Sequence, residues 1–73
     1  MKPTILVVDD DDGVRYTLRE LLEASDLAVV EAEEGRAALT RLDEGRVDLV
    51  ITDLKMPGMS GLELLEALAR RAD

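Results

Sequence analysis

The chain has 73 residues and a net charge of −8 from 17 acidic and 9 basic residues, with neither cysteine nor histidine. This composition excludes disulfides, thiolate zinc sites and imidazole catalysis, so any metal would be held by oxygen, as magnesium, calcium and manganese are. The negative net charge argues against direct nucleic-acid binding. The apolar run at residues 5–8 is too short to span a membrane. The absence of cysteine fits a cytoplasmic location.

The first elements expected along the chain are a strand, a helix and a second strand. Residues 5–8 are an apolar, β-branched run that ends abruptly in acids, which is typical of a strand covered on both faces of a parallel sheet. After these acids the apolar residues recur at helical spacing, which predicts a helix. Either Asp11 or Asp12 is placed to cap its amino end. Residues 27–30 form the second apolar run. The residues that recur at helical spacing are Val14, Leu18, Leu21, Leu22 and Ser25.

The second half of the chain repeats this alternation. Residues 37–42 predict a short helix closed by Gly45, and residues 48–53 form another buried run that ends in a carboxylate. Ser60 and Glu63 have the spacing of a capping box that starts a third helix. Strands that alternate with helices predict an α/β fold with a parallel sheet and right-handed crossovers. The expected buried stripe of the third helix is Leu64, Leu65, Leu68 and Ala69.

Carboxylates stand at the ends of two of the predicted strands. Asp9 and Asp10 follow the first strand, and Asp53 ends the third. With the strand order 2-1-3 these strands would be neighbours, about 4.8 Å apart, at the edge where open parallel sheets bind ligands. Three acids held so closely need a cation or a proton, and Mg²⁺ suits a site with few protein ligands. Asp53 stands alone at its strand end and is the expected nucleophile, because a carboxylate can form an aspartyl-phosphate.

These residues carry a family resemblance that extends over the whole chain. The acidic pair Asp9 and Asp10, together with the string that begins at Asp53, contains Met56 and Pro57 and ends at Gly61, resembles a CheY-like response-regulator receiver domain. The resemblance implies a flavodoxin-like sheet. It also implies a signalling module rather than a stand-alone enzyme.

The resemblance assigns roles to four residues. Asp53 would accept a phosphoryl group from the phosphohistidine of a sensor histidine kinase. Asp10 would hold Mg²⁺ directly, and Asp9 mostly through water. Asp53 itself and the backbone carbonyl of Lys55 would supply the further ligands.

The resemblance also implies that the chain is partial. Receiver domains have five βα units and the sequence supplies three, so residues 1–73 would be the N-terminal part of a single receiver domain. The family's switch Ser/Thr after the fourth strand and its phosphate-pairing Lys after the fifth have no counterpart here. We therefore expect impaired phosphorylation, and an uncovered third strand at residues 49–52 that pairs with another chain in a homodimer or larger assembly.

Other functions fit the acidic run less well. An EF-hand with Gly13 at its sixth position would place Val8 first and Arg19 last, where acids are required. A phosphatase with an aspartyl nucleophile would have a D-x-D pattern, which Asp9 and Asp11 match only because four acids run together. The alternative function that stays open is a non-signalling structural fragment that self-associates through an exposed sheet edge.

Overall fold

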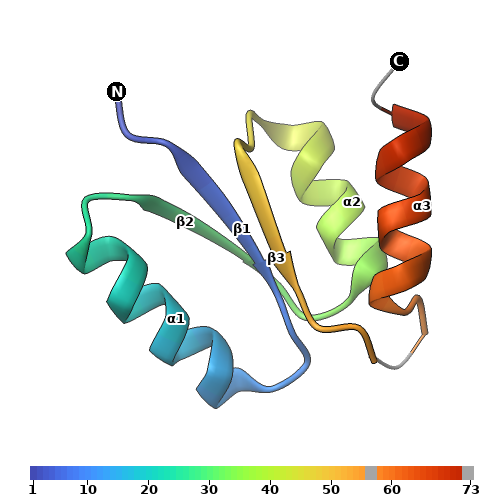
Figure 1. Cartoon of the computed structure of the whole chain (residues 1–73), viewed down its shortest axis with the longest axis horizontal. Coiled ribbons are helices and arrows are strands. Elements are labelled where there is room, and N and C mark those ends of the chain that lie inside the picture. Colours follow the sequence, from blue (N-terminus) through green and yellow to red (C-terminus); the bar gives the residue numbers. More distant parts are fainter. Residues whose placement is uncertain (56–57, 72–73) are drawn as a thin grey trace.

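The computed structural model describes residues 1–55 and 58–71, in which strands and helices alternate along the chain (Figure 1). This order confirms the α/β alternation predicted from the sequence. The strands are β1 (Thr4–Val8), β2 (Ala28–Ala32) and β3 (Leu49–Thr52), and the helices are α1 (Asp12–Ala24), α2 (Gly35–Glu44) and α3 (Gly61–Arg71).

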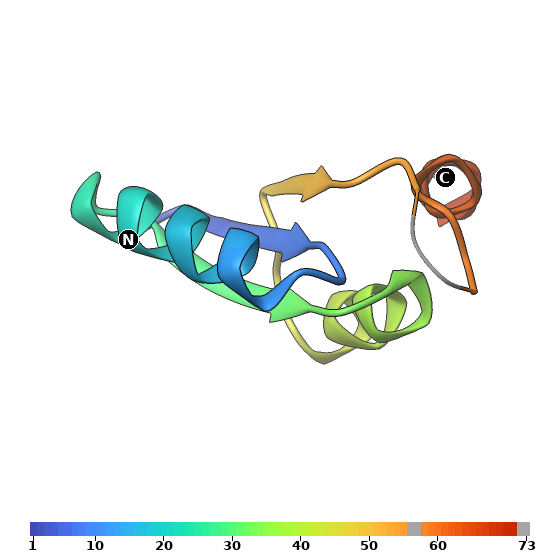
Figure 2. The same cartoon turned by 90° about the horizontal axis from the view of Figure 1, so that it is seen from below.

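The three strands form one parallel sheet in the order β2-β1-β3, as predicted. In Figure 2 the three strand arrows point the same way and β1 lies between the other two. The end of β1 marks the register, because Val8 lies opposite Ala32 of β2 and opposite Thr52 of β3. All three strands therefore finish at the same edge of the sheet. This sheet order and the helical layers are those of a flavodoxin-like fold.

The hydrophobic core lies between β1 and the layer formed by α2 and α3. Figure 1 shows these two helices on one side of the sheet and α1 on the other. Leu64 is the fully buried side chain that α3 contributes, and burying a leucine stabilises a fold by about 1.5–3 kcal/mol. The buried members of this core cluster are Leu6, Val8, Ala32, Ala38 and Leu64.

Helix α1 buries a different set of side chains from the predicted one. Val14 is 40% exposed and Leu21 is 62% exposed, whereas Arg15 is 8% exposed. The helix meets the sheet through the face that carries Arg15 and Arg19, because both guanidinium groups pair with Glu31 of β2. The predicted stripe is therefore wrong at Val14, Leu21 and Ser25, which are exposed, whereas Leu18 and Leu22 are partly buried. The cap is Asp11, whose side chain accepts hydrogen bonds from two backbone N–H groups of the first turn.

The third helix begins as predicted but packs through a narrower face. Ser60 and Glu63 form the capping box, with Glu63 N donating to Ser60 Oγ at 3.1 Å and Ser60 N donating to Glu63 Oε1 at 3.0 Å. Leu64 and Leu68 pack into the core, but Leu65 and Ala69 are exposed, so the predicted stripe is wrong at these two positions. None of the helices within the described residues is long and apolar enough to cross a membrane.

Candidate metal centre

The backbone brings the residues that follow β1 and β3 side by side. Asp53 N donates to the carbonyl oxygen of Val8 at 3.0 Å, which extends the β1–β3 pairing one residue beyond the strand. Asp9 N donates in the same way to Ala32 O of β2 at 3.1 Å. The acids therefore leave the sheet from adjacent positions at its carboxyl edge.

The three acids singled out from the sequence meet at this edge. One carboxylate oxygen from each of Asp9, Asp10 and Asp53 lies within 4.8 Å of the other two. At about 4 Å two like charges repel by roughly 1–4 kcal/mol, depending on the local dielectric. A divalent cation among them would remove this repulsion. The donor set consists of carboxylate oxygens, which are the ligands that Mg²⁺ prefers, so the residues fit this ion.

Short backbone contacts orient two of the carboxylates. Asp11 N donates to Asp9 Oδ1 at 2.9 Å, and Lys55 N donates to Asp53 Oδ1 at 3.2 Å. Lys55 thus touches the cluster through its N–H, while the role of its carbonyl as a metal ligand stays a prediction. Met56 and Pro57, which belong to the motif quoted above, lie outside the described residues.

Gly61 contacts the backbone next to Asp53, and the sequence analysis did not anticipate this contact. Its N–H donates to Leu54 O at 3.0 Å. A Cβ atom built on it would lie 2.1 Å from the carbonyl oxygen of Asp53, so only glycine fits here. The first turn of α3 is therefore packed directly on the backbone that carries Asp53. The signal available in the sequence was a poor helix former placed at the start of a helix.

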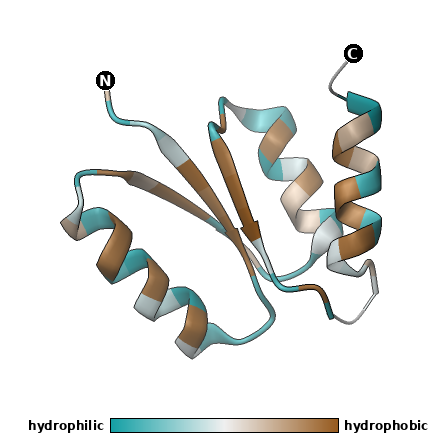
Figure 3. Ribbon diagram, in the orientation of Figure 1, coloured by the Kyte–Doolittle hydropathy of each residue, from teal (hydrophilic) through white to brown (hydrophobic). Residues whose placement is uncertain are grey.

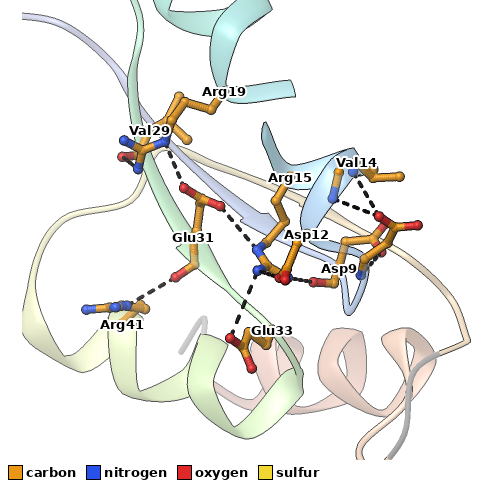
Figure 4. A network of polar contacts seen from close by, with 11 residues as sticks. Asp9, Asp12, Val14, Arg15, Arg19, Val29, Glu31, Glu33 and Arg41 are labelled. Atoms are coloured by element: carbon orange, nitrogen blue, oxygen red, sulfur yellow. Dashed lines mark hydrogen bonds and ion pairs between the residues drawn. The ribbon is translucent and has the colours of Figure 1, made fainter. Parts of the chain in front are cut away.

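Arg15 is the second contact that the sequence analysis missed (Figure 4). Its Nη1 donates to the carbonyl oxygen of Asp9 at 2.6 Å, and its Nε donates to Glu31 Oε1 at 3.1 Å. Its Nη2 pairs with Asp12 and lies 4.0 Å from Glu33 Oε1. Burial acts to lower the pKa of Arg15, but the hydrogen bonds and charges of Asp12 and Glu31 outweigh it and the pKa is raised. The available signal was Glu31, an acid directly after the apolar run at residues 27–30.

Comparison with known proteins shows one consistent family. The family described as response regulator receiver domain matches residues 5–73. The transcriptional regulatory protein FixJ of Azorhizobium caulinodans is 48% identical over 68 residues, which are 89% of this chain and 31% of that protein. Sporulation initiation phosphotransferase F of Bacillus subtilis is 38% identical over 68 residues, which are 93% of this chain and 55% of that protein.

Solved structures of receiver domains are similar to this chain as well. The chemotaxis protein CheY4 of Vibrio cholerae superposes with a TM-score of 0.94 at 30% identity, over 99% of this chain and 60% of that one. The response regulator TrrA of Thermotoga maritima, in complex with Mg(2+)-BeF, superposes with a TM-score of 0.91 at 42% identity, over 97% of this chain and 61% of that one. The chain therefore spans about a third to a little over half of these curated relatives, and about three fifths of these structures.

Proposed function

The chain belongs to the family of response regulator receiver domains, and from this premise we propose that it is a phosphoacceptor module that is phosphorylated on Asp53 in a Mg²⁺-dependent reaction. Receiver domains are signalling modules of two-component systems rather than stand-alone enzymes. The observation that carries the proposal is the meeting of Asp9, Asp10 and Asp53 within 4.8 Å. That residues 1–73 are the N-terminal part of a larger receiver domain stays a prediction.

In the proposed reaction the nucleophile is a carboxylate oxygen of Asp53. It forms a bond to phosphorus while the phosphorus–nitrogen bond of a sensor kinase's phosphohistidine breaks, and the imidazole nitrogen keeps the electron pair. Mg²⁺, when bound, neutralises the charge that develops on the phosphoryl oxygens.

The chain's own residues prepare this step by position. Asp9 and Asp10 present oxygens for the cation next to Asp53. Lys55 N–H fixes one oxygen of the Asp53 carboxylate, and Gly61 lets α3 pack against its backbone. The Mg(2+)-BeF complex of the Thermotoga maritima relative supports Mg²⁺ as the ion.

Phosphorylation can be tested with acetyl phosphate as the donor. We expect intact-mass spectrometry of the chain incubated with acetyl phosphate and Mg²⁺ to show a partial adduct of one phosphoryl group. Asp53→Asn removes the nucleophile and should abolish the adduct, and chelation of Mg²⁺ should prevent it in the wild type. An adduct that persists in Asp53→Asn, or a folded wild type that gains none, would contradict the proposal.

Self-association is a second candidate function that one observation favours. Within the described residues β3 pairs on one side only, with β1, and Leu49 at its start is 55% exposed. Figure 3 shows hydrophobic residues along most of this edge strand. We propose that two copies of the chain pair through β3, because an exposed apolar edge is a template for another strand. Such pairing is compatible with phosphorylation and is tested separately.

A further inference from the structure

We propose that Arg15 is a positioning residue for the acidic cluster, whose guanidinium holds the Asp9–Asp10 peptide where both carboxylates can bind Mg²⁺. This inference rests on the proposed function, because it concerns the same metal site. Arg15 itself touches none of the reacting atoms. Its effect on the site would pass through the backbone of the β1–α1 loop.

The bond to Asp9 is the contact that carries the inference. Arg15 Nη1 lies 2.6 Å from Asp9 O, and hydrogen bonds from a charged donor are about twice as strong as those between neutral groups. The Asp9 carbonyl belongs to the peptide that joins Asp9 to Asp10. The position of this one oxygen therefore constrains both residues of the acidic pair.

The guanidinium is itself held from several sides, so it can serve as a fixed point. Nε is bound to Glu31 of β2, and Nη2 pairs with Asp12 of α1. The Arg15 side chain is 9% exposed, so its charge depends on these partners, because a buried charge that loses its partner is left uncompensated. The planar guanidinium of arginine presents five donors in a fixed geometry, whereas the lysine ammonium is a compact group whose three donors rotate. Arg15 thus connects the β1–α1 loop, α1 and β2 beside the cluster.

Arg19 supplies a matched control because it lies one helical turn further along α1 and shares the same partner. Its Nε lies 2.8 Å from Glu31 Oε2, and its Nη1 lies 3.7 Å from Glu23. Its Nη2 donates to the backbone carbonyl oxygen of Val29 in β2 at 3.4 Å. Removing Arg19 therefore disturbs the same charge network without touching the Asp9 carbonyl.

The direction of the change in Mg²⁺ affinity separates positioning from simple electrostatics. Removing a positive charge near three carboxylates should by Coulomb's law alone strengthen Mg²⁺ binding. Positioning predicts the opposite for Arg15→Gln, a loss of about tenfold, as is typical when a group that holds a metal ligand in place is removed. Arg15→Lys keeps the charge but not the fork and should also bind more weakly. Arg19→Gln should bind as tightly as the wild type or slightly more tightly.

The experiment is a calorimetric titration of Mg²⁺ into the wild type and these three variants, each shown to be folded by circular dichroism at the working temperature. A second measurement, the carbonyl ¹³C resonance of Asp9 in the metal-free protein, reports the hydrogen bond directly. The chemical shift of this resonance should change in Arg15→Gln and stay unchanged in Arg19→Gln. Both results together would support the positioning role.

Two results would overturn the inference: unchanged or tighter Mg²⁺ binding in Arg15→Gln, or an equal loss of affinity in Arg15→Gln and Arg19→Gln. Failure of the proposed function gives a different pattern. A wild type that binds Mg²⁺ but gains no phosphoryl group on Asp53 counts against phosphorylation alone. The weaker Mg²⁺ binding of Arg15→Gln would then still support the positioning role.

Discussion

At the scale of single residues, Gly61 gives the most direct link between helix packing and the site. Gly61→Ala would place a Cβ atom 2.1 Å from Asp53 O and 2.7 Å from Leu54 Cα, and neither backbone atom can rotate away. We expect a loss of about 1–3 kcal/mol in the free energy of unfolding, the usual cost of overpacking, measured by urea denaturation. Relief of the contact would also displace Asp53.

The control for this change is Gly45→Ala. A Cβ atom there meets no atom within 4 Å, and the backbone φ of −174° is extended, so alanine fits. We expect a change within about 0.5 kcal/mol, as for surface substitutions away from special features. Equal effects of the two substitutions would show that lost glycine flexibility, and not contact with Asp53, explains the result.

The acids of the site could be predicted from the sequence, whereas the residues that hold them could not. The sequence indicates the acids because they follow apolar runs that predict strands, and the strand order brings those runs together. These acids are Asp9, Asp10 and Asp53. Arg15 and Gly61 act through contacts with backbone atoms of other elements. The sequence marks Gly61 and Glu31 as unusual residues for their positions, but it does not show which backbone atoms of other elements are contacted, because that depends on how the strands and helices are assembled.

At the scale of elements, Asp48 fastens the start of β3 to the start of β1. Thr4 N donates to Asp48 Oδ2 at 2.7 Å, and this hydrogen bond, followed by the charge and hydrogen bond of Arg46, lowers the pKa of Asp48. A carboxyl group with a lowered pKa in the folded state stabilises the fold above its unfolded pKa, and that contribution disappears as pH falls through the folded value. The affected range begins near pH 5 and extends below pH 4.

We therefore expect Asp48→Asn to make the unfolding free energy depend less steeply on pH in this range, as measured by urea denaturation at a series of pH values. At neutral pH the variant should be less stable than the wild type. Asp26→Asn is the control, because its carboxylate is 86% exposed and its backbone φ of 65° suits asparagine. The role of Asp48 would be refuted by wild-type acid sensitivity in Asp48→Asn.

The sequence indicated the elements themselves better than the faces they bury. Apolar runs and the capping box of Ser60 and Glu63 depend on local chemistry, so the alternation of strands and helices could be predicted. Which side of α1 meets the sheet depends on Arg15 and Arg19 finding Glu31 across the interface. A pattern of leucines at helical spacing cannot show that two arginines will share the inner face with Leu18 and Leu22.

At the scale of the whole molecule, the edge of β3 that has no partner strand in the described part of the chain predicts association. We expect sedimentation velocity to show a weight-average mass that rises with concentration. Leu49→Lys should shift it toward the monomer, because lysine on an edge strand opposes pairing and Leu49 is already 55% exposed. Leu62→Lys is the control, since this side chain is 63% exposed but belongs to helix α3 and not to the edge strand. A wild type that stays monomeric at the highest concentration would contradict the prediction.

The central place of β1 also bears on how the chain assembles during synthesis. β1 is the first strand in the sequence and the middle strand of the sheet, with β2 on one side and β3 on the other. It leaves the ribosome before either neighbour, so it is already present when each partner strand is made. β2 can pair with it once α1 has been made, and β3 can follow on the opposite side. The sheet can therefore grow outward in the order of translation, without inserting a new strand between two that are already paired.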